Sequence, residues 1–111
     1  MKTILVIDDN ETFRFLLSEW LMLKGFQPII TGDGFDGIRL AQDHRPDLIL
    51  CDVNMPTMSG FEVLQQLKVD ANTAHLPFFF LTSESKLELE FAQYLGATGL
   101  VQKTENLSVL H

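Results

Sequence analysis

The sequence has little cysteine and no long apolar run, and each shortage excludes a class of protein. Cys51 is the only cysteine, so neither an internal disulfide nor a cysteine-based metal site can form. Its place inside an apolar segment predicts that it packs as a small hydrophobic residue in a reducing compartment. No apolar stretch approaches the roughly 20 residues that span a bilayer, and the first residues lack the features of a signal peptide. We therefore expect a cytoplasmic protein without a membrane segment.

Basic residues are also scarce. Eight Lys and Arg residues stand against 15 Asp and Glu residues, and the formal net charge is −7. This balance argues against direct nucleic-acid binding by this segment and permits a divalent cation or a basic partner. With 111 residues, 46% of them hydrophobic, the chain can form one domain with one core, which we take to span residues 1–111.

What the sequence does contain is a regular alternation of short apolar runs with segments of helical periodicity. The predicted strands are residues 2–7, 26–31, 47–52, 78–81 and 99–102. The predicted helices follow them, from about residue 11 to Gly25 and over about 34–44, 60–69 and 85–95. This alternation predicts the α/β class, with a doubly wound, five-stranded parallel sheet of strand order 2-1-3-4-5, as in flavodoxin-like folds.

Acidic residues follow two of the predicted strands. Asp8 and Asp9 come directly after the first strand, and Asp52 ends the third, which reads as a central strand buried on both faces. In the predicted order, the switch point of the sheet lies between these strands, so we expect the three carboxylates to converge there. Asn10 is the expected cap of the helix that follows.

Three carboxylates in one crevice would repel one another. At about 5 Å and an effective dielectric constant near 20, each like-charge pair costs roughly 3 kcal/mol. A hard divalent cation resolves this repulsion, and Mg²⁺ suits the site because it takes one or two carboxylates and keeps coordination positions open for a phosphate oxygen.

Two more strand ends add groups to the same edge. Thr82 offers a hydroxyl after the fourth strand, and Lys103 offers an ammonium after the fifth. Taken alone, Thr82 is an ordinary strand residue and Lys103 is an ordinary surface lysine. Together with the acids and a cation, they fit phosphoryl transfer, in which positioning and charge neutralisation do most of the catalysis.

These positions resemble the receiver domain of two-component response regulators, and the resemblance runs through essentially the whole chain. The residues that carry it are Asp8, Asp9, Asp52, the downstream Met55-Pro56 and Gly60, Thr82 and Lys103. The resemblance implies that Asp52 is the phosphoacceptor and that Thr82 and Lys103 bind the phosphoryl oxygens. It implies Mg²⁺ ligation by Asp9, Asp52 and the Asn54 backbone carbonyl, with Asp8 acting through water.

The resemblance also implies a signalling cycle. A histidine kinase or histidine phosphotransfer protein would give its phosphoryl group to Asp52, a protein-interaction face would shift, and the phosphoryl group would be hydrolysed by the domain itself. Such a domain is a switch and is not classed as an enzyme. A downstream effector could follow, and the segment could come from a longer response regulator or a hybrid kinase.

The sequence departs from the receiver pattern near its end. Leu100 stands where receivers commonly have an aromatic residue, and Thr104 follows Lys103 where a proline with a cis peptide bond is usual. A cis bond without proline costs about 2.5 to 4 kcal/mol, so this bond is expected to be trans or strained. Residues 105–111 predict a last helix that is short or truncated.

Other functions remain as alternatives. A degenerate receiver would act only as a phosphorylation-independent interaction module, a reading that Leu100 and Thr104 favour. A phosphatase or phosphotransferase of the haloacid dehalogenase type would need a second Asp two residues after Asp52, where this chain has Asn54. Residues 32–37 match G-x-G-x-x-G, but they follow the second strand and carry two carboxylates, so they predict a turn and a helix start.

The helix predicted from about residue 11 to Gly25 carries apolar residues beyond its main apolar stripe. Phe15 is one of them, and it lies two residues after Phe13. One explanation is packing against a last helix. The second is that Phe13 and Phe15 help to dock the helical bundle of a partner.

Overall fold

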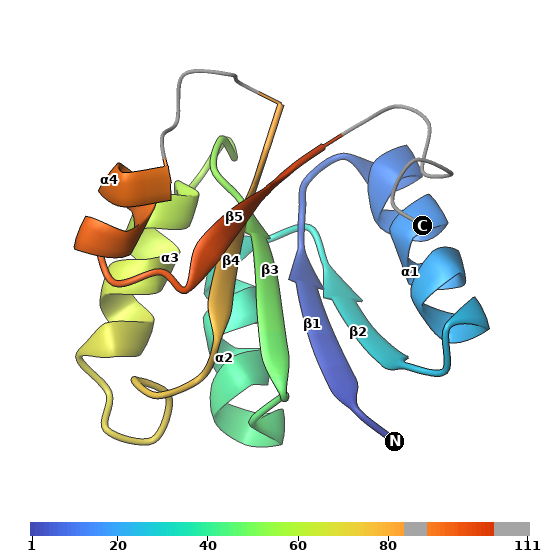
Figure 1. Cartoon of the computed structure of the whole chain (residues 1–111), viewed down its shortest axis with the longest axis horizontal. Helices are drawn as coiled ribbons and strands as arrows, with labels where there is room; N and C mark the ends of the chain where they lie inside the picture. The colour runs from blue at the N-terminus through green and yellow to red at the C-terminus, as the bar shows by residue number, and fades with distance from the viewer. Residues whose placement is uncertain (84–88, 104–111) are drawn as a thin grey trace.

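The computed structural model describes residues 1–83 and 89–103 (Figure 1). Its strands form one parallel sheet of order β2-β1-β3-β4-β5, which confirms the predicted fold class. The strands are β1 (Thr3–Ile7), β2 (Gln27–Thr31), β3 (Leu48–Asp52), β4 (Phe78–Thr82) and β5 (Gly99–Gln102). The helices are α1 (Glu11–Leu23), α2 (Gly34–His44), α3 (Gly60–Lys68) and α4 (Leu89–Tyr94).

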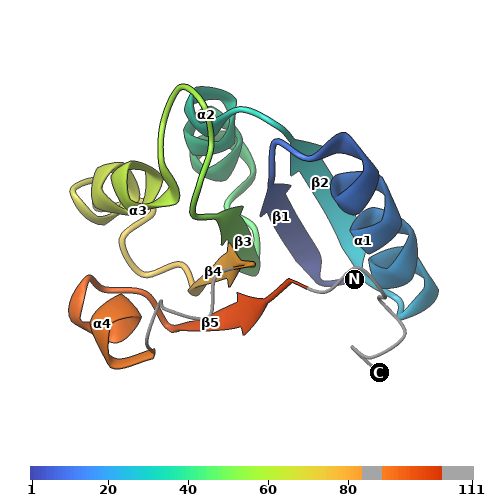
Figure 2. The same cartoon turned by 90° about the horizontal axis from the view of Figure 1, so that it is seen from above.

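Helices cover both faces of the sheet. Figure 2 shows α1 on one side, with α2, α3 and α4 on the other. Alternate residues of β1 serve the two faces: Ile4 and Val6 pack with α1, whereas Leu5 and Ile7 belong to the larger core beneath the other helices. This period of two explains why the strand reads as a continuous apolar run, because both of its faces are buried.

The helix starts follow capping rules. Asn10 accepts a hydrogen bond from the Phe13 N–H at 2.9 Å and is the N-cap of α1, as predicted. Asp33 and Ser59 cap α2 and α3 in the same way. Asp33 lies within the G-x-G-x-x-G stretch, so that stretch is a turn and a helix start, as expected.

Most of the predicted boundaries agree with the structure to within one or two residues. The helix predicted over residues 85–95 is described from Leu89 to Tyr94, and its predicted start lies outside the described residues. The last helix and the Lys103–Thr104 peptide bond lie outside them too. Cys51 is fully buried in the larger core, in line with its predicted packing role, and burial raises the pKa of its thiol.

Candidate functional site

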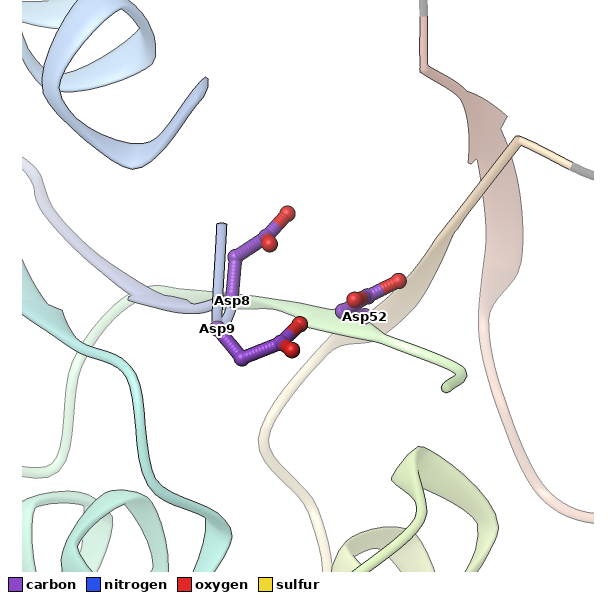
Figure 3. A group of neighbouring side chains, drawn as sticks. All are labelled: Asp8, Asp9 and Asp52. Carbon is purple, nitrogen blue, oxygen red and sulfur yellow. The ribbon is translucent and has the colours of Figure 1, made fainter. Parts of the chain in front are cut away.

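Three acidic side chains meet at the carboxyl edge of the sheet. Ile7 of β1 and Cys51 of β3 are register partners, so the residues that follow them, Asp8 and Asp52, lie at the same level on the carboxyl edge of the sheet. Asp9 comes next on the chain. Each of the three residues offers a carboxylate oxygen, and these oxygens lie within 4.8 Å of one another (Figure 3).

These acids differ in burial. Asp8 is fully buried and Asp52 nearly so, whereas Asp9 is exposed. The pKa of Asp52 is raised to about 7, chiefly by burial and then by the negative charge of Asp8, against the opposing effect of the Lys103 ammonium. A hydrogen bond with Asp9 acts in the same direction as burial. Without a cation, Asp52 is therefore only partly ionised near neutral pH.

Lys103 brings its ammonium into this cluster from the end of β5. Its Nζ lies 2.8 Å from Asp8 Oδ2 and 3.8 Å from Asp52 Oδ2, and the side chain is only 14% exposed. The Lys103 N–H donates to the Thr82 carbonyl at 2.7 Å, which fixes the end of β5 to the end of β4. Thr82 itself is buried at this edge. The strand ends thus bring together the groups that the sequence placed there.

The oxygen atoms of the acidic cluster fit the requirements of a Mg²⁺ ion. Asp8 Oδ1 accepts a hydrogen bond from the Asn10 N–H at 2.9 Å, but Asp8 Oδ2 is buried and accepts no aligned hydrogen bond from the described residues. Lys103 neutralises its charge at 2.8 Å without hydrogen-bond geometry. This carboxylate oxygen, which accepts no hydrogen bond from the described residues, and the two neighbouring carboxylates are hard oxygen donors of the kind that suits Mg²⁺. Asn54 lies in the loop two residues after Asp52 and is exposed.

Arg14 supports the site and was missed from the sequence. Its Nη1 donates to the Asp8 carbonyl at 2.7 Å and so fixes the backbone that carries the buried acid. Gly32 makes room for this arginine, because a Cβ there would lie 2.6 Å from Nη1. The sequence does carry a signal for this contact, because Arg14 is a basic residue one helical turn after Asn10, the cap residue that follows the paired acids.

Gly60 shapes the chain after Asp52. A Cβ at this position would overlap the Asp52 carbonyl oxygen, and the Gly60 N–H donates to the Val53 carbonyl at 2.8 Å. The start of α3 can therefore pack directly against the end of β3 only when residue 60 lacks a side chain. This contact gives a physical reason for the glycine downstream of Asp52.

The remaining residues singled out in the sequence lie around this edge. Leu100 is half-buried against the larger core. Phe15 is exposed on α1, with 56% of its surface accessible, whereas Phe13 is half-buried and its ring faces Lys103. Among the described residues, no helix is both long and apolar enough to cross a membrane.

A doubly wound sheet with an acidic cluster at its switch point, which a lysine reaches from the end of β5, places the protein in the class of flavodoxin-like α/β domains. The family model described as the response regulator receiver domain matches residues 4–111. The chain therefore belongs to the receiver-domain family of two-component response regulators, which confirms the resemblance drawn from the sequence.

Individual relatives agree with this assignment. The polar-differentiation response regulator DivK of Brucella anthropi is 37% identical over 82 residues, which cover 74% of this chain and 67% of DivK. The structure of the chemotaxis protein CheY4 of Vibrio cholerae aligns with a TM-score of 0.89 and 32% identity, covering 99% of this chain and 92% of CheY4. The response regulator TrrA of Thermotoga maritima, solved in complex with Mg²⁺ and BeF, aligns with a TM-score of 0.85 and 28% identity over 99% of this chain and 93% of TrrA.

Proposed function

We propose that this receiver is a working phosphoacceptor and that Asp52 takes the phosphoryl group in a Mg²⁺-dependent reaction. The observation that carries the proposal is the buried Asp52 carboxylate, which shares one cluster with Asp8 and Asp9 and lies 3.8 Å from the Lys103 ammonium. A degenerate receiver has no need of such a cluster, because buried acids repel one another unless a cation or a phosphoryl group compensates them.

The donor is the phosphohistidine of a histidine kinase or a histidine phosphotransfer protein. An Asp52 carboxylate oxygen attacks the phosphorus, a P–O bond forms, the P–N bond to the imidazole breaks, and the leaving imidazole takes up a proton. The Thr82 hydroxyl and the Lys103 ammonium bind the phosphoryl oxygens and stabilise the charge that develops on them.

Asp9, Asp52 and the Asn54 backbone carbonyl would hold Mg²⁺, with Asp8 acting through water, and the bound ion would supply positive charge between the carboxylates and the incoming phosphoryl group. Arg14 and the Asn10 N–H keep Asp8 in place for this task. The ion pairs with Asp8 and Asp52 keep the Lys103 ammonium close to the place that the oxygens of a phosphoryl group on Asp52 would take.

Phosphorylation then changes a protein-interaction surface, and the domain hydrolyses its own aspartyl phosphate. In this sense the protein is a signalling switch of the cytoplasm rather than an enzyme that turns over an external substrate. The names of its relatives point to different pathways, polar differentiation and chemotaxis. To this chain we assign only the role that these relatives share, which is that of a response regulator.

The test is to incubate the protein with acetyl phosphate and measure its intact mass, with Mg²⁺ and with EDTA. We expect one acid-labile phosphoryl group with Mg²⁺, none with EDTA, none on Asp52→Asn and much less on Lys103→Ala. Beryllofluoride binding serves as a second readout if hydrolysis is fast. Failure of both with the wild type would favour the interaction-only module, and turnover of external phosphoesters would favour a phosphatase.

A further inference from the structure

The ring of Phe13 lies against the Lys103 ammonium. Nζ is 4.6 Å from the ring centroid, within the distance at which a cation is attracted to the face of an aromatic ring. The lysine side chain is only 14% exposed, so water competes weakly for its charge and the attraction is stronger than at an open surface. Phe13 is thus a third neighbour of the ammonium, beside Asp8 and Asp52.

The two carboxylates attract this ammonium but do not fix its orientation through hydrogen bonds. The contact with Asp8 Oδ2 is close but lacks hydrogen-bond geometry, and the distance to Asp52 Oδ2 is 3.8 Å, longer than a hydrogen bond. A lysine side chain has a flexible stem with several rotatable bonds, so charge attraction without directional bonds leaves it several conformations. A ring face that covers one side of the ammonium removes some of them.

The position of Phe13 is itself well determined. Its N–H donates to the Asn10 side chain at 2.9 Å, in the capped first turn of α1. Its side chain packs against the smaller core cluster that includes Leu17 and Leu81. Because this turn follows directly after Asp8 and Asp9, one short segment sets the positions of both the acids and the ring.

We propose that Phe13 is a positioning residue for Lys103, whose ring holds the ammonium at the place where it binds a phosphoryl oxygen on Asp52. The proposal rests on the proposed phosphoacceptor function. It assigns Phe13 to the interior of the site and leaves Phe15, which is exposed, as the residue of the pair that is free to meet a partner.

The test compares three single variants with the wild type. Phe13→Leu removes the aromatic ring but keeps an apolar side chain, Phe13→Tyr keeps the ring, and Phe15→Leu is the matched control two residues away on the exposed surface. The first readout is the NMR shift of the Lys103 Cε protons, assigned with Lys103→Ala. A ring face over the ammonium moves these protons upfield, whether or not the protein accepts phosphate.

The second readout is the rate of phosphorylation by acetyl phosphate at saturating Mg²⁺. We expect Phe13→Leu to lose the upfield shift and to react about three- to tenfold more slowly, in line with the strength of a partly buried cation–π contact. Phe13→Tyr should keep the upfield shift and the wild-type rate, and Phe15→Leu should change neither the shift nor the rate. Wild-type behaviour of the tyrosine variant separates positioning by the ring from a general packing defect.

Two outcomes would overturn the proposal and can be told apart. If the wild type is phosphorylated and Phe13→Leu reacts at the same rate, or if the upfield shift is absent from the wild type, Phe13 does not position Lys103. If the wild type takes up neither a phosphoryl group nor beryllofluoride, the proposed function itself fails, and the role of Phe13 fails with it even where the upfield shift is seen.

Discussion

Replacing Asp52 by Asn should stabilise the protein when divalent cations are absent. The pKa of Asp52 rises from 3.8 to about 7 on folding, chiefly through burial and then through the charge of Asp8. A carboxyl group with a raised pKa favours the folded state only while it is protonated. This contribution is complete below about pH 4 and is lost as the pH rises towards 7. Asparagine has no charge to bury, so Asp52→Asn avoids the loss.

The size of the effect follows from the shift. A rise from 3.8 to about 7 corresponds to about 4 kcal/mol at most. Solvent reaches the edge of the sheet and screens the cluster, which reduces the expected gain to about 2 kcal/mol. For a domain of this size, that gain raises the Tm by roughly 10 °C.

The assay is thermal unfolding by circular dichroism at pH 4.5 and pH 8, with EDTA and with Mg²⁺. The advantage of Asp52→Asn should be large at pH 8 with EDTA, small at pH 4.5, and reduced by Mg²⁺, which stabilises the ionised wild type. Asp43→Asn, which removes a charge from an exposed position on α2, is the control and should change little. Equal stability of Asp52→Asn and the wild type at pH 8 in EDTA would show that ionised Asp52 does not destabilise the fold.

Further predictions concern the surroundings of the site. Gly60→Ala should destabilise the protein by about 1–3 kcal/mol in urea unfolding, because its methyl group would push into the main chain at the end of β3. Arg14→Leu should weaken Mg²⁺ binding, followed by NMR titration, about tenfold by freeing the Asp8 backbone, whereas Arg39→Leu, at an exposed ion pair, should not. Phe15→Ser should slow transfer from a cognate kinase about fivefold and leave acetyl phosphate equally effective; equal slowing of both would exclude a docking role.

The fold could be predicted because its signals are local and repeated. The run from Ile4 to Ile7 is apolar throughout because both faces of β1 are covered, and the alternation of such runs with helical periods fixes a parallel, doubly wound sheet. Topology then brings Asp8 and Asp52 to one edge, so the acidic cluster could be placed without coordinates.

The contacts around the cluster could not be predicted, because they depend on distances between segments that are remote in sequence. Phe13 reads as an apolar residue of a helix, and only the folded chain brings it to within 4.6 Å of the ammonium of Lys103. The hydrogen bond from Arg14 to the Asp8 carbonyl likewise depends on the space that Gly32 leaves at the end of β2. The pKa of Asp52 depends on burial, which sequence spacing does not measure.

The most direct test of the central claim is to locate the phosphoryl group chemically. After incubation with acetyl phosphate and Mg²⁺, borohydride reduces an aspartyl phosphate to homoserine, and peptide mass spectrometry identifies the position. We expect homoserine at position 52 when Mg²⁺ is present and none when Mg²⁺ is removed. Homoserine at position 8 or 9 would contradict the assignment of Asp52. No homoserine anywhere, together with no beryllofluoride binding, would contradict the phosphoacceptor function.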